Sequence, residues 1–280
     1  MKTIHLITAF CAASLTAACG GGGGSSPAPV PPPVVVATTV SSVTTDTLMY
    51  SKAARITVNG QNLSSAVSVV APGCDGIAAV AGGTTSQLVY TCKPVVSGPI
   101  TVSVQANGAT LATITPSVPT PRVTMQTSLG QMILELNPKQ APITVANFMQ
   151  YVASGFYNGL IFHRVVPGFV IQGGGFNSSL QPATTLAPIK LEVPNGLSNI
   201  RGSIAMARTT APDSATSQFF INSVDNVSLD TSGGGYAVFG SVVAGLPVAD
   251  AIAAVPTQTS GGFTNVPVTP IVITSATQTR

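Results

Sequence analysis

Short runs in which Val, Thr and Ile alternate with small polar residues constrain the fold of this chain most strongly. They include ARITVNG, SQLVYTC and PITVSVQANG, and turn-forming pairs such as NG, PG, GG and SG separate them across residues 34–118. Alternation with a period of two is typical of strands with one buried face, and turns at this spacing are typical of a small β-sandwich. We therefore predict a mainly β protein whose first folded part is a sandwich over residues 34–118.

The composition agrees with a folded β protein and excludes one class of function. Charged residues make up 7% of the 280, against about 25% in average globular proteins, while 45% are hydrophobic. The formal net charge of +3 is spread thinly, and no cluster of Lys and Arg stands out. Nucleic acid is therefore not an expected partner.

The first nineteen residues are typical of an export signal. Lys2 is followed by a short apolar run at residues 4–15 and by small residues that end at Cys19. The run is too short to span a membrane comfortably. Residues 1–19 resemble a bacterial lipoprotein signal, which predicts an acylated Cys19 as a membrane anchor, although Thr16 stands where leucine is commoner. The alternative is ordinary signal cleavage, with Cys19 lost or free.

Composition divides the rest of the chain into three further segments. Residues 20–33 form a Gly/Ser-rich and then Pro-rich linker. The segment 34–118 broadly resembles an immunoglobulin-type bacterial surface module, either a spacer or a protein-contact module, and shows no catalytic pattern. The closely spaced prolines of PSVPTPRV mark a junction, so we place the second folded domain at 119–280. Gly20 after the cysteine favours the outer membrane, facing the periplasm.

The cysteines fit an exported protein. Cys11 and Cys19 belong to the signal, which leaves Cys74 and Cys92 as a predicted disulfide. A loop of this length would stabilise the fold by about 3 kcal/mol in the chain-entropy model. Two buried free thiols are the alternative. His163 is the only histidine after the signal, and no zinc-binding spacing occurs, so we predict no metal site.

Three motifs in the second domain carry the chemistry: FHRVVPGFVIQGG at residues 162–174, AMART at 205–209 and SQFFIN at 217–222. They join one arginine to aromatic and aliphatic side chains and a glutamine, without a neighbouring acid, base or thiol. Such a set suits binding an apolar group while polarising one amide. In order and spacing the motifs resemble the cyclophilin family of peptidyl-prolyl cis/trans isomerases, over residues 123–276.

The resemblance implies a closed antiparallel β-barrel capped by two helices, and the local patterns agree with it. Two alternating strands around residues 129–130 predict a hairpin. Pro142 opens a predicted helix that Gly155 ends, and a second helix is expected over residues 247–254. Strand-like runs such as LIFHRVV, FVIQGG and YAVFGSV lie between and around them. The implied activity, rotation of X-Pro bonds in exported proteins, needs no cofactor.

The resemblance also assigns roles to individual residues. Arg164 matches the catalytic arginine, Gln172 the glutamine that holds it in position, and Gln218 a second polar residue at the rim. The backbone at Arg208 matches the segment that pairs with the substrate chain. The residues that match the proline pocket are Phe169, Met206, Phe220 and Leu229. His163 and Phe219 alternate to the other side of their strands, which predicts structural roles.

Four positions depart from the commonest pattern of the family. Gly175 stands where aspartate is common, and we expect it to affect loop stiffness more than chemistry. Ser228 replaces a tryptophan or phenylalanine at the pocket rim, so tight binding of cyclosporin-type ligands is not expected. Tyr236 replaces a histidine, and Arg208 replaces the asparagine of eukaryotic members; AMART followed by GYAVFG is typical of the bacterial branch.

Two other functions remain as alternatives. The same pocket could bind proline-containing segments as a chaperone or scaffold with weak or no catalysis. Both halves could instead be inert β domains of an adhesive surface protein. A hydrolase is not expected, because no GxSxG motif occurs and one histidine without a positioned acid does not make a triad. The expected partners are proline-containing segments of client proteins, and the expected assembly is a monomer.

Overall fold

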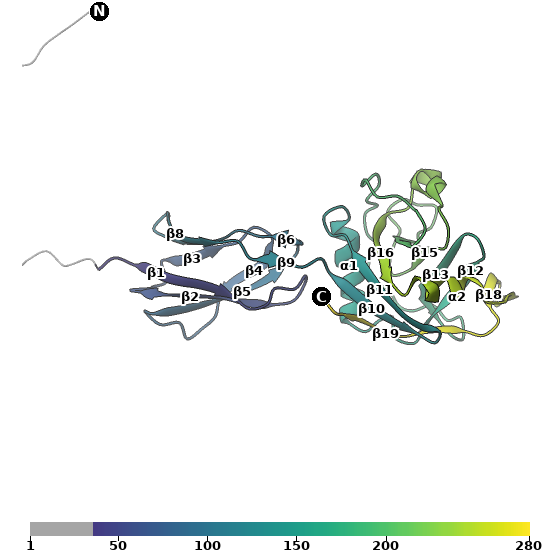
Figure 1. Cartoon of the computed structure of the whole chain (residues 1–280), viewed down its shortest axis with the longest axis horizontal. Helices are drawn as coiled ribbons and strands as arrows, with labels where there is room; N and C mark the ends of the chain where they lie inside the picture. The colour runs from purple at the N-terminus through teal and green to yellow at the C-terminus, as the bar shows by residue number, and fades with distance from the viewer. Residues whose placement is uncertain (1–35) are drawn as a thin grey trace, which may run out of the picture. The chain divides into compact units, whose positions relative to one another are not determined.

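The structure is a computed structural model that describes residues 36–280 and is mainly β, as predicted (Figure 1). The predicted signal, Cys19 and the linker 20–33 lie outside the described residues. Across residues 36–280, none of the helices has the length and apolar character needed to cross a membrane.

Two sheets precede the barrel, as the sandwich prediction requires. One has four strands in the order β1-β2-β5-β4 and the other three in the order β3-β7-β8, with a short β6-β9 pair beside them. Alternate residues of β2 and β7 are buried, among them Ile56 and Val104. The buried Tyr90 hydroxyl donates to the Val67 carbonyl at 2.7 Å, which links β5 to β3. The strands are β1 (Thr39–Thr45), β2 (Ala54–Gln61), β3 (Val67–Val70), β4 (Cys74–Ala79), β5 (Gln87–Pro94), β6 (Gly98–Pro99), β7 (Val102–Ala106), β8 (Ala109–Ile114) and β9 (Ser117–Val118).

A disulfide joins Cys74 of β4 to Cys92 of β5, with the Cα atoms 5.3 Å apart. The two strands are antiparallel neighbours in the four-stranded sheet, and Cys74 faces Pro94 in their register. Cys92 is buried in the core of this part of the chain. The cross-link therefore fixes the end of a strand pair that hydrogen bonds already hold.

Eight strands after residue 121 close into an antiparallel barrel in the order β10-β11-β16-β14-β15-β13-β12-β19. This confirms the predicted barrel, and β19 closes it by pairing with both β10 and β12. The strands are β10 (Arg122–Thr127), β11 (Gly130–Leu136), β12 (Leu160–Val166), β13 (Val170–Asn177), β14 (Ser203–Met206), β15 (Phe219–Asn222), β16 (Val238–Ala244) and β19 (Ile271–Gln278).

Two helices accompany the barrel, and both were predicted. Helix α1 (Pro142–Ala153) begins at the predicted proline, and Gly155 follows it with φ +68°, a conformation that favours glycine. Helix α2 (Leu246–Ala253) begins and ends one residue earlier than predicted. The hairpin of β17 (Thr257–Ser260) and β18 (Phe263–Pro267) was not predicted, because its strands are short and mostly polar.

An aromatic cluster joins α1 to the barrel strands. The ring of Phe148 on α1 lies 5.2 Å from Tyr157, 5.9 Å from Phe219 and 5.1 Å from Phe239. All four side chains are fully buried. Phe148 therefore packs against rings from β15, β16 and the loop before β12, and β15 carries part of the site described below.

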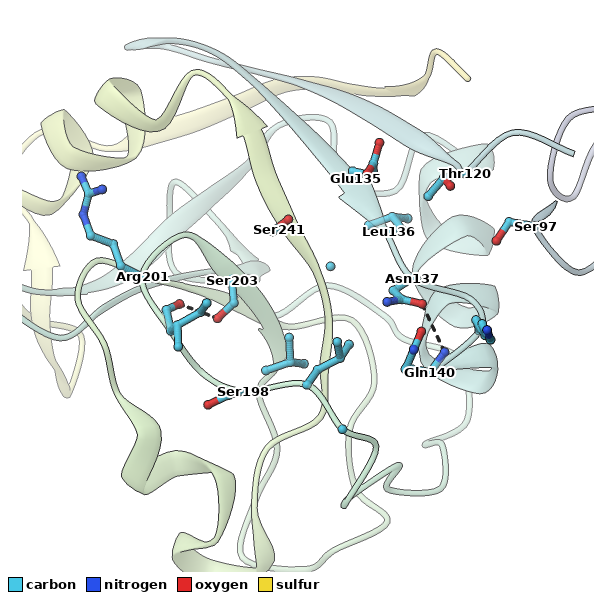
Figure 2. A pocket seen from close by; sticks show the side chains of 16 residues that line it. Ser97, Thr120, Glu135, Leu136, Asn137, Gln140, Ser198, Arg201, Ser203 and Ser241 are labelled. Atoms are coloured by element: carbon cyan, nitrogen blue, oxygen red, sulfur yellow. Dashed lines mark hydrogen bonds between the residues drawn. The ribbon is translucent and has the colours of Figure 1, made fainter.

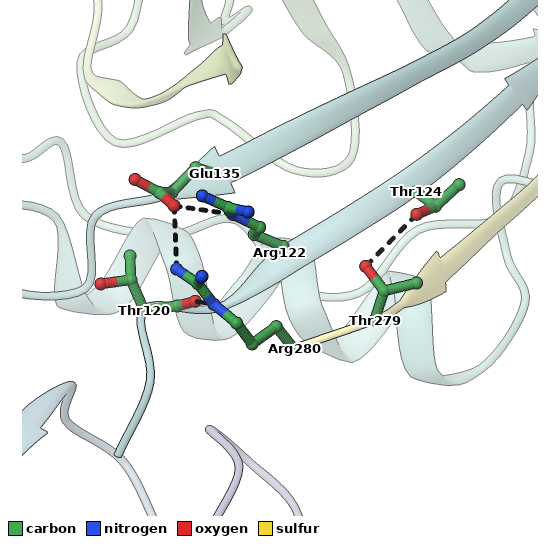
Figure 3. Close-up of polar contacts among 6 residues, drawn as sticks. All are labelled: Thr120, Arg122, Thr124, Glu135, Thr279 and Arg280. Carbon is green, nitrogen blue, oxygen red and sulfur yellow. Dashed lines mark hydrogen bonds and ion pairs between the residues drawn. The ribbon is translucent and has the colours of Figure 1, made fainter. Parts of the chain in front are cut away.

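The carboxylate of Glu135 links residues of three neighbouring strands at one end of the barrel (Figure 3). Glu135 of β11 accepts hydrogen bonds from Arg122 of β10 at 2.8 Å and from Arg280, just after β19, at 3.0 Å. Arg280 also donates to the Thr120 carbonyl at 3.1 Å. These groups are partly exposed, so each pair stabilises the fold by about 0–1 kcal/mol.

Candidate active site

The three sequence motifs meet on neighbouring strands of the barrel. Arg164 of β12 lies opposite Gln172 of β13, and Gln172 in turn lies opposite Phe220 of β15. Phe220 lies opposite Ala205 of β14. Residues that face each other across antiparallel strands share one side of the sheet. The register therefore places the arginine, the glutamine and the phenylalanine side by side.

These side chains line a cavity of about 270 Å³. Beside it lies a small apolar cluster, separate from the main core, built on Val170, Ala205, Phe220 and Val238. The cavity is therefore apolar on one side and bordered by cations and an amide on the other. The lining residues are Arg164, Phe169, Val170, Gln172, Ala207, Arg208, Phe220, Leu229 and Tyr236.

Arg164 is half-buried at the edge of this cavity and is held by an amide. Its Nη1 donates to Oε1 of Gln172 at 3.3 Å, and Nε2 of Gln172 donates to Oε1 of Gln218 at 3.0 Å. Among the described residues, no carboxylate forms an ion pair with Arg164. The guanidinium keeps its positive charge uncompensated and has donors to spare for a ligand in the cavity.

The expectation that Met206 lines the pocket is corrected by the structure. Met206 is 2% exposed, belongs to the main barrel core and lies opposite Phe219, not Phe220. Since opposite residues share a face, Met206 must point inward with Phe219. Ala205, one residue earlier, faces the pocket side in its place.

Val170 and Ala207 line the cavity, although neither was among the predicted pocket residues. Strands β13 and β14 are buried along almost their whole length, so alternation does not distinguish their two faces. Ala207 follows β14 directly, where strand alternation ceases to be a guide. Gln218 was predicted to lie at the rim of the pocket. In the structure it accepts a hydrogen bond from Gln172 and is not among the residues that line the cavity.

The side chain of Arg208 is used to hold a loop. Its guanidinium donates to the carbonyls of Gly233 and Gly235 at 2.6–3.0 Å and to that of Thr209 at 2.9 Å. Its Cζ lies 4.7 Å from the ring centre of Tyr236, and that ring packs edge-on against Phe220. Arg208 thus supports one wall of the cavity through Tyr236.

A buried polar cluster fixes the opposite rim, where the 3₁₀ helix η1 (Val227–Asp230) carries Leu229. Asp230 accepts hydrogen bonds from the Ser198 hydroxyl and from the backbone and side chain of Asn199. Burial acts to raise the pKa of Asp230, but these hydrogen bonds outweigh it and hold the pKa below its usual value. Asn226 donates to the Phe169 carbonyl at 2.9 Å, so Phe169 is held by the same cluster of loops.

Comparison with known proteins identifies the barrel. The family described as "Cyclophilin type peptidyl-prolyl cis-trans isomerase/CLD" matches residues 122–278. The chain belongs to this family. Peptidyl-prolyl cis-trans isomerase A of Dickeya dadantii is 56% identical over 156 residues, which cover 55% of this chain and 82% of the relative. Peptidyl-prolyl cis-trans isomerase B of Escherichia coli is 49% identical over 160 residues, covering 55% and 98%.

The predicted family and enzyme class are thereby confirmed: the barrel is a cyclophilin and an isomerase of the peptidyl-prolyl type. A solved cyclophilin-type isomerase from Cryptosporidium parvum, 26% identical, aligns over 57% of this chain and 98% of its own with a TM-score of 0.49.

His163, next to Arg164, is buried in this cyclophilin among aromatic side chains. Its ring lies 4.7 Å from Phe176 and 6.5 Å from Phe263. Burial, and to a smaller extent the Arg164 cation, lower the pKa of His163 from 6.5 to about 4, although hydrogen bonds with Ile161 and Gln218 act in the opposite direction. The imidazole is therefore neutral at pH 7, which agrees with the structural role predicted for it.

A larger cavity of about 580 Å³ is lined mainly by other residues of the cyclophilin barrel, together with Ser97 and Thr120 from the preceding part of the chain (Figure 2). Its lining includes Asn137, Ser203 and Ser241 together with Arg201 and Glu135. Arg201 is paired with Asp250 at 2.8 Å, and Glu135 is shared by two arginines. Because its arginine is neutralised, we assign the active site to the smaller cavity that contains Arg164.

Proposed function

We propose that this cyclophilin accelerates rotation about X-Pro bonds in exported proteins, with Arg164 as the catalytic residue. One observation carries the proposal: the Arg164 guanidinium, which has no carboxylate partner within residues 36–280, borders a partly apolar cavity of about 270 Å³. Such a cavity can hold a proline ring on its apolar side while the cation faces the amide of the same residue.

The proposed reaction requires the site only to lower a rotational barrier. Rotation about an X-Pro bond takes tens of seconds without a catalyst, because it breaks amide resonance over a barrier of about 18–20 kcal/mol. A donor aimed at the proline nitrogen favours the pyramidal nitrogen of the twisted amide over the planar, conjugated one. Lowering the barrier by about 5–7 kcal/mol accelerates the reaction roughly 10⁴–10⁵-fold. No bond to the substrate forms or breaks, so no nucleophile is required.

The remaining residues then take distinct parts. Phe169, Phe220 and Leu229 bind the proline ring, and Gln172 holds the arginine through the hydrogen bond described above. Within residues 36–280, the backbone N–H and C=O of Arg208 have no hydrogen-bond partner, which leaves them free to pair with a substrate chain. A peptide backbone bound there would place its proline in the adjoining cavity.

An isomerase assay with a proline-containing peptide tests the proposal. Arg164→Ala should abolish most of the acceleration, while Arg201→Ala, which removes an exposed cation paired with Asp250, should not change it. Equal activity of Arg164→Ala and the native protein would exclude Arg164 as the catalytic residue. Thermal unfolding of both variants controls for loss of the fold.

A second function is favoured by one observation, the exposed Ser228 beside Leu229. Because Ser228 is not a large apolar residue, the pocket makes fewer apolar contacts with a small proline peptide. The protein would then bind proline-containing segments as a chaperone module with weak catalysis. Saturable peptide binding without acceleration supports this function, whereas acceleration that depends on Arg164 supports the enzyme.

Export and anchoring complete the proposal. We propose that the chain is secreted to the periplasmic face of a bacterial envelope and anchored, in the outer membrane, by an acylated Cys19. The support is the sequence of residues 1–19 and the Cys74–Cys92 disulfide, since such bonds persist in oxidising compartments. The mass of the mature protein tests the proposed anchor. We expect a mature protein that begins at Cys19 and carries an acyl group there. A mature protein that begins at another residue and has no acyl group would contradict the anchor. Size-exclusion chromatography of the same sample tests the expected monomer.

A further inference from the structure

The five arginines of residues 119–280 fall into two groups. Arg122, Arg201 and Arg280 each form an ion pair with a carboxylate at 2.8–3.0 Å. Arg164 and Arg208 form none with any residue in the range 36–280, and these two line the cavity of the candidate active site. The arginine charges are therefore paired away from this cavity and left uncompensated beside it.

The acidic residue that adjoins the cavity lining does not balance these two cations. Asp230 follows the lining residue Leu229 but is not itself among the lining residues. Its carboxylate oxygens accept hydrogen bonds from Ser198 and Asn199. None of the nine lining residues is acidic, so a ligand in the cavity meets two cations and no anion.

Both guanidinium groups also keep a hydrogen-bond donor for a ligand. Arg164 uses one of its five side-chain N–H groups, for Gln172. Arg208 uses four, for the backbone carbonyls described above, which leaves one N–H of Nη1 without a partner in the part of the chain that the structure describes. Those carbonyls are uncharged, so the bonds fix the position of Arg208 without cancelling its charge. Both arginines are half-buried, where salt screens a charge less than at an exposed site.

We propose that this cyclophilin acts preferentially on X-Pro bonds that have an acidic side chain in a residue adjoining the proline. The inference rests on the proposed isomerase function and names the class of substrate for it. Arg208 is then a specificity-determining residue, whose guanidinium attracts a carboxylate of the chain that pairs with its backbone. Arg164 adds to the same attraction but is also needed for rotation, so Arg208 is the residue whose variants test the preference.

Matched peptides, blocked at both ends, test the preference in the native protein. Glu and Gln are nearly equal in size, and at neutral pH only Glu carries a charge. We expect kcat/KM to be about three- to tenfold higher with Glu than with Gln at low salt, either before the proline (Ala-Glu-Pro-Phe) or after it (Ala-Ala-Pro-Glu). Lysine in the same position should give the lowest value. The Glu/Gln ratio should fall toward one as the salt concentration approaches about 1 M, where the Debye length is about 3 Å.

Arg208→Gln and Arg201→Gln are matched variants, because each removes one positive charge. Arg208→Gln should lower the Glu/Gln ratio about twofold or more. Arg201→Gln should leave the ratio unchanged, since Arg201 is paired with Asp250 and does not line this cavity. Arg208→Lys keeps the charge and should retain most of the ratio. Comparing two peptides within each variant cancels any general loss of activity caused by loosening the loop that Arg208 holds.

Three outcomes overturn the inference: a ratio close to one at both positions, a ratio that does not change with salt, or a native ratio in Arg208→Gln. Failure of the proposed function gives a different result, because the native protein would then accelerate neither the Glu nor the Gln peptides. Equal acceleration of Glu and Gln peptides rejects the acidic preference alone and leaves the isomerase function in place.

Discussion

The two faces of β14 and β15 differ in what they contact, although the same four residues per strand build both. On the inner face, Met206 and Phe219 lie opposite each other and belong to the main core of the barrel. On the outer face, Ala205 and Phe220 lie opposite each other and belong to the small cluster beside the cavity. One step along a strand therefore separates residues that hold the fold from residues that bind a ligand.

Neighbouring polar residues of β12 also differ in what they contact. Arg164 and Gln172 border the cavity, while His163, one residue before Arg164, is buried among Phe176 and Phe263. His163 is inaccessible and contributes through packing, whereas Arg164 and Gln172 keep donors available for a substrate. Substitutions at adjacent positions should therefore affect different measurable quantities.

The adjacent phenylalanines of β15 give the largest expected effect. Phe219 packs edge-on against Phe148, Tyr157 and Phe162, so Phe219→Ala should lower the free energy of unfolding by about 3–5 kcal/mol. Phe220→Ala opens onto an existing cavity and should cost less stability but raise KM for proline peptides. Urea unfolding measures the stability of both variants, and isomerase kinetics measure their KM. Equal stability losses with equal KM values would contradict the proposed difference between the two faces.

Arg164→Ala should show the next largest effect, and it should be confined to activity. Removing one preorganised donor from a partly desolvated site typically costs about 10²–10³ in rate. We expect kcat/KM to fall by that factor, while the midpoint of unfolding stays close to that of the native protein, because Arg164 forms no ion pair with any residue in the range 36–280. Arg164→Lys keeps the charge but not the planar fork, so it should restore only part of the rate. Full restoration by lysine would show that charge alone is sufficient.

The buried His163 should give the stability of the fold a distinct dependence on pH. Its pKa is about 4 in the folded protein and about 6.5 when unfolded, so the unfolded chain binds more protons between these values. Folding stability should therefore fall as the pH is lowered from about 6.5 to about 4, by about 3 kcal/mol, and this contribution should change no further below pH 4. Urea unfolding across this range should show a shallower dependence in His163→Phe, and identical slopes would contradict the assignment.

Much of this architecture could be predicted from the sequence. Pro142 and Gly155 bound α1 because a proline suits the first turn and a glycine accepts a positive φ after the last. The distinction between Phe219 and Phe220 follows from alternation alone. The barrel motifs were specific enough to indicate the family, whose known site then supplied Arg164 and Gln172.

The errors and omissions have a common physical cause. Met206 was assigned to the pocket, yet the register of β14 against β15, which no local pattern contains, turns it inward beside Phe219. Val170 lies on a strand buried on both faces, where hydrophobicity carries no direction. The hydrogen bond between Gln172 and Gln218 joins positions 46 residues apart and depends on side-chain packing that no local pattern contains.

Ser228→Phe should produce the smallest effect and test the outer face alone. Ser228 is exposed on η1, next to Leu229, which lines the cavity. A phenylalanine that covers about 50 Å² of a bound proline residue would add about 1 kcal/mol of binding, or roughly fivefold in KM. Unfolding should be almost unchanged, because a surface position is altered. Val243→Phe, on the exposed side of β16, controls for added surface hydrophobicity. If both variants lowered KM equally, non-specific hydrophobic binding of the peptide, rather than an added wall of the pocket, would account for the lower KM.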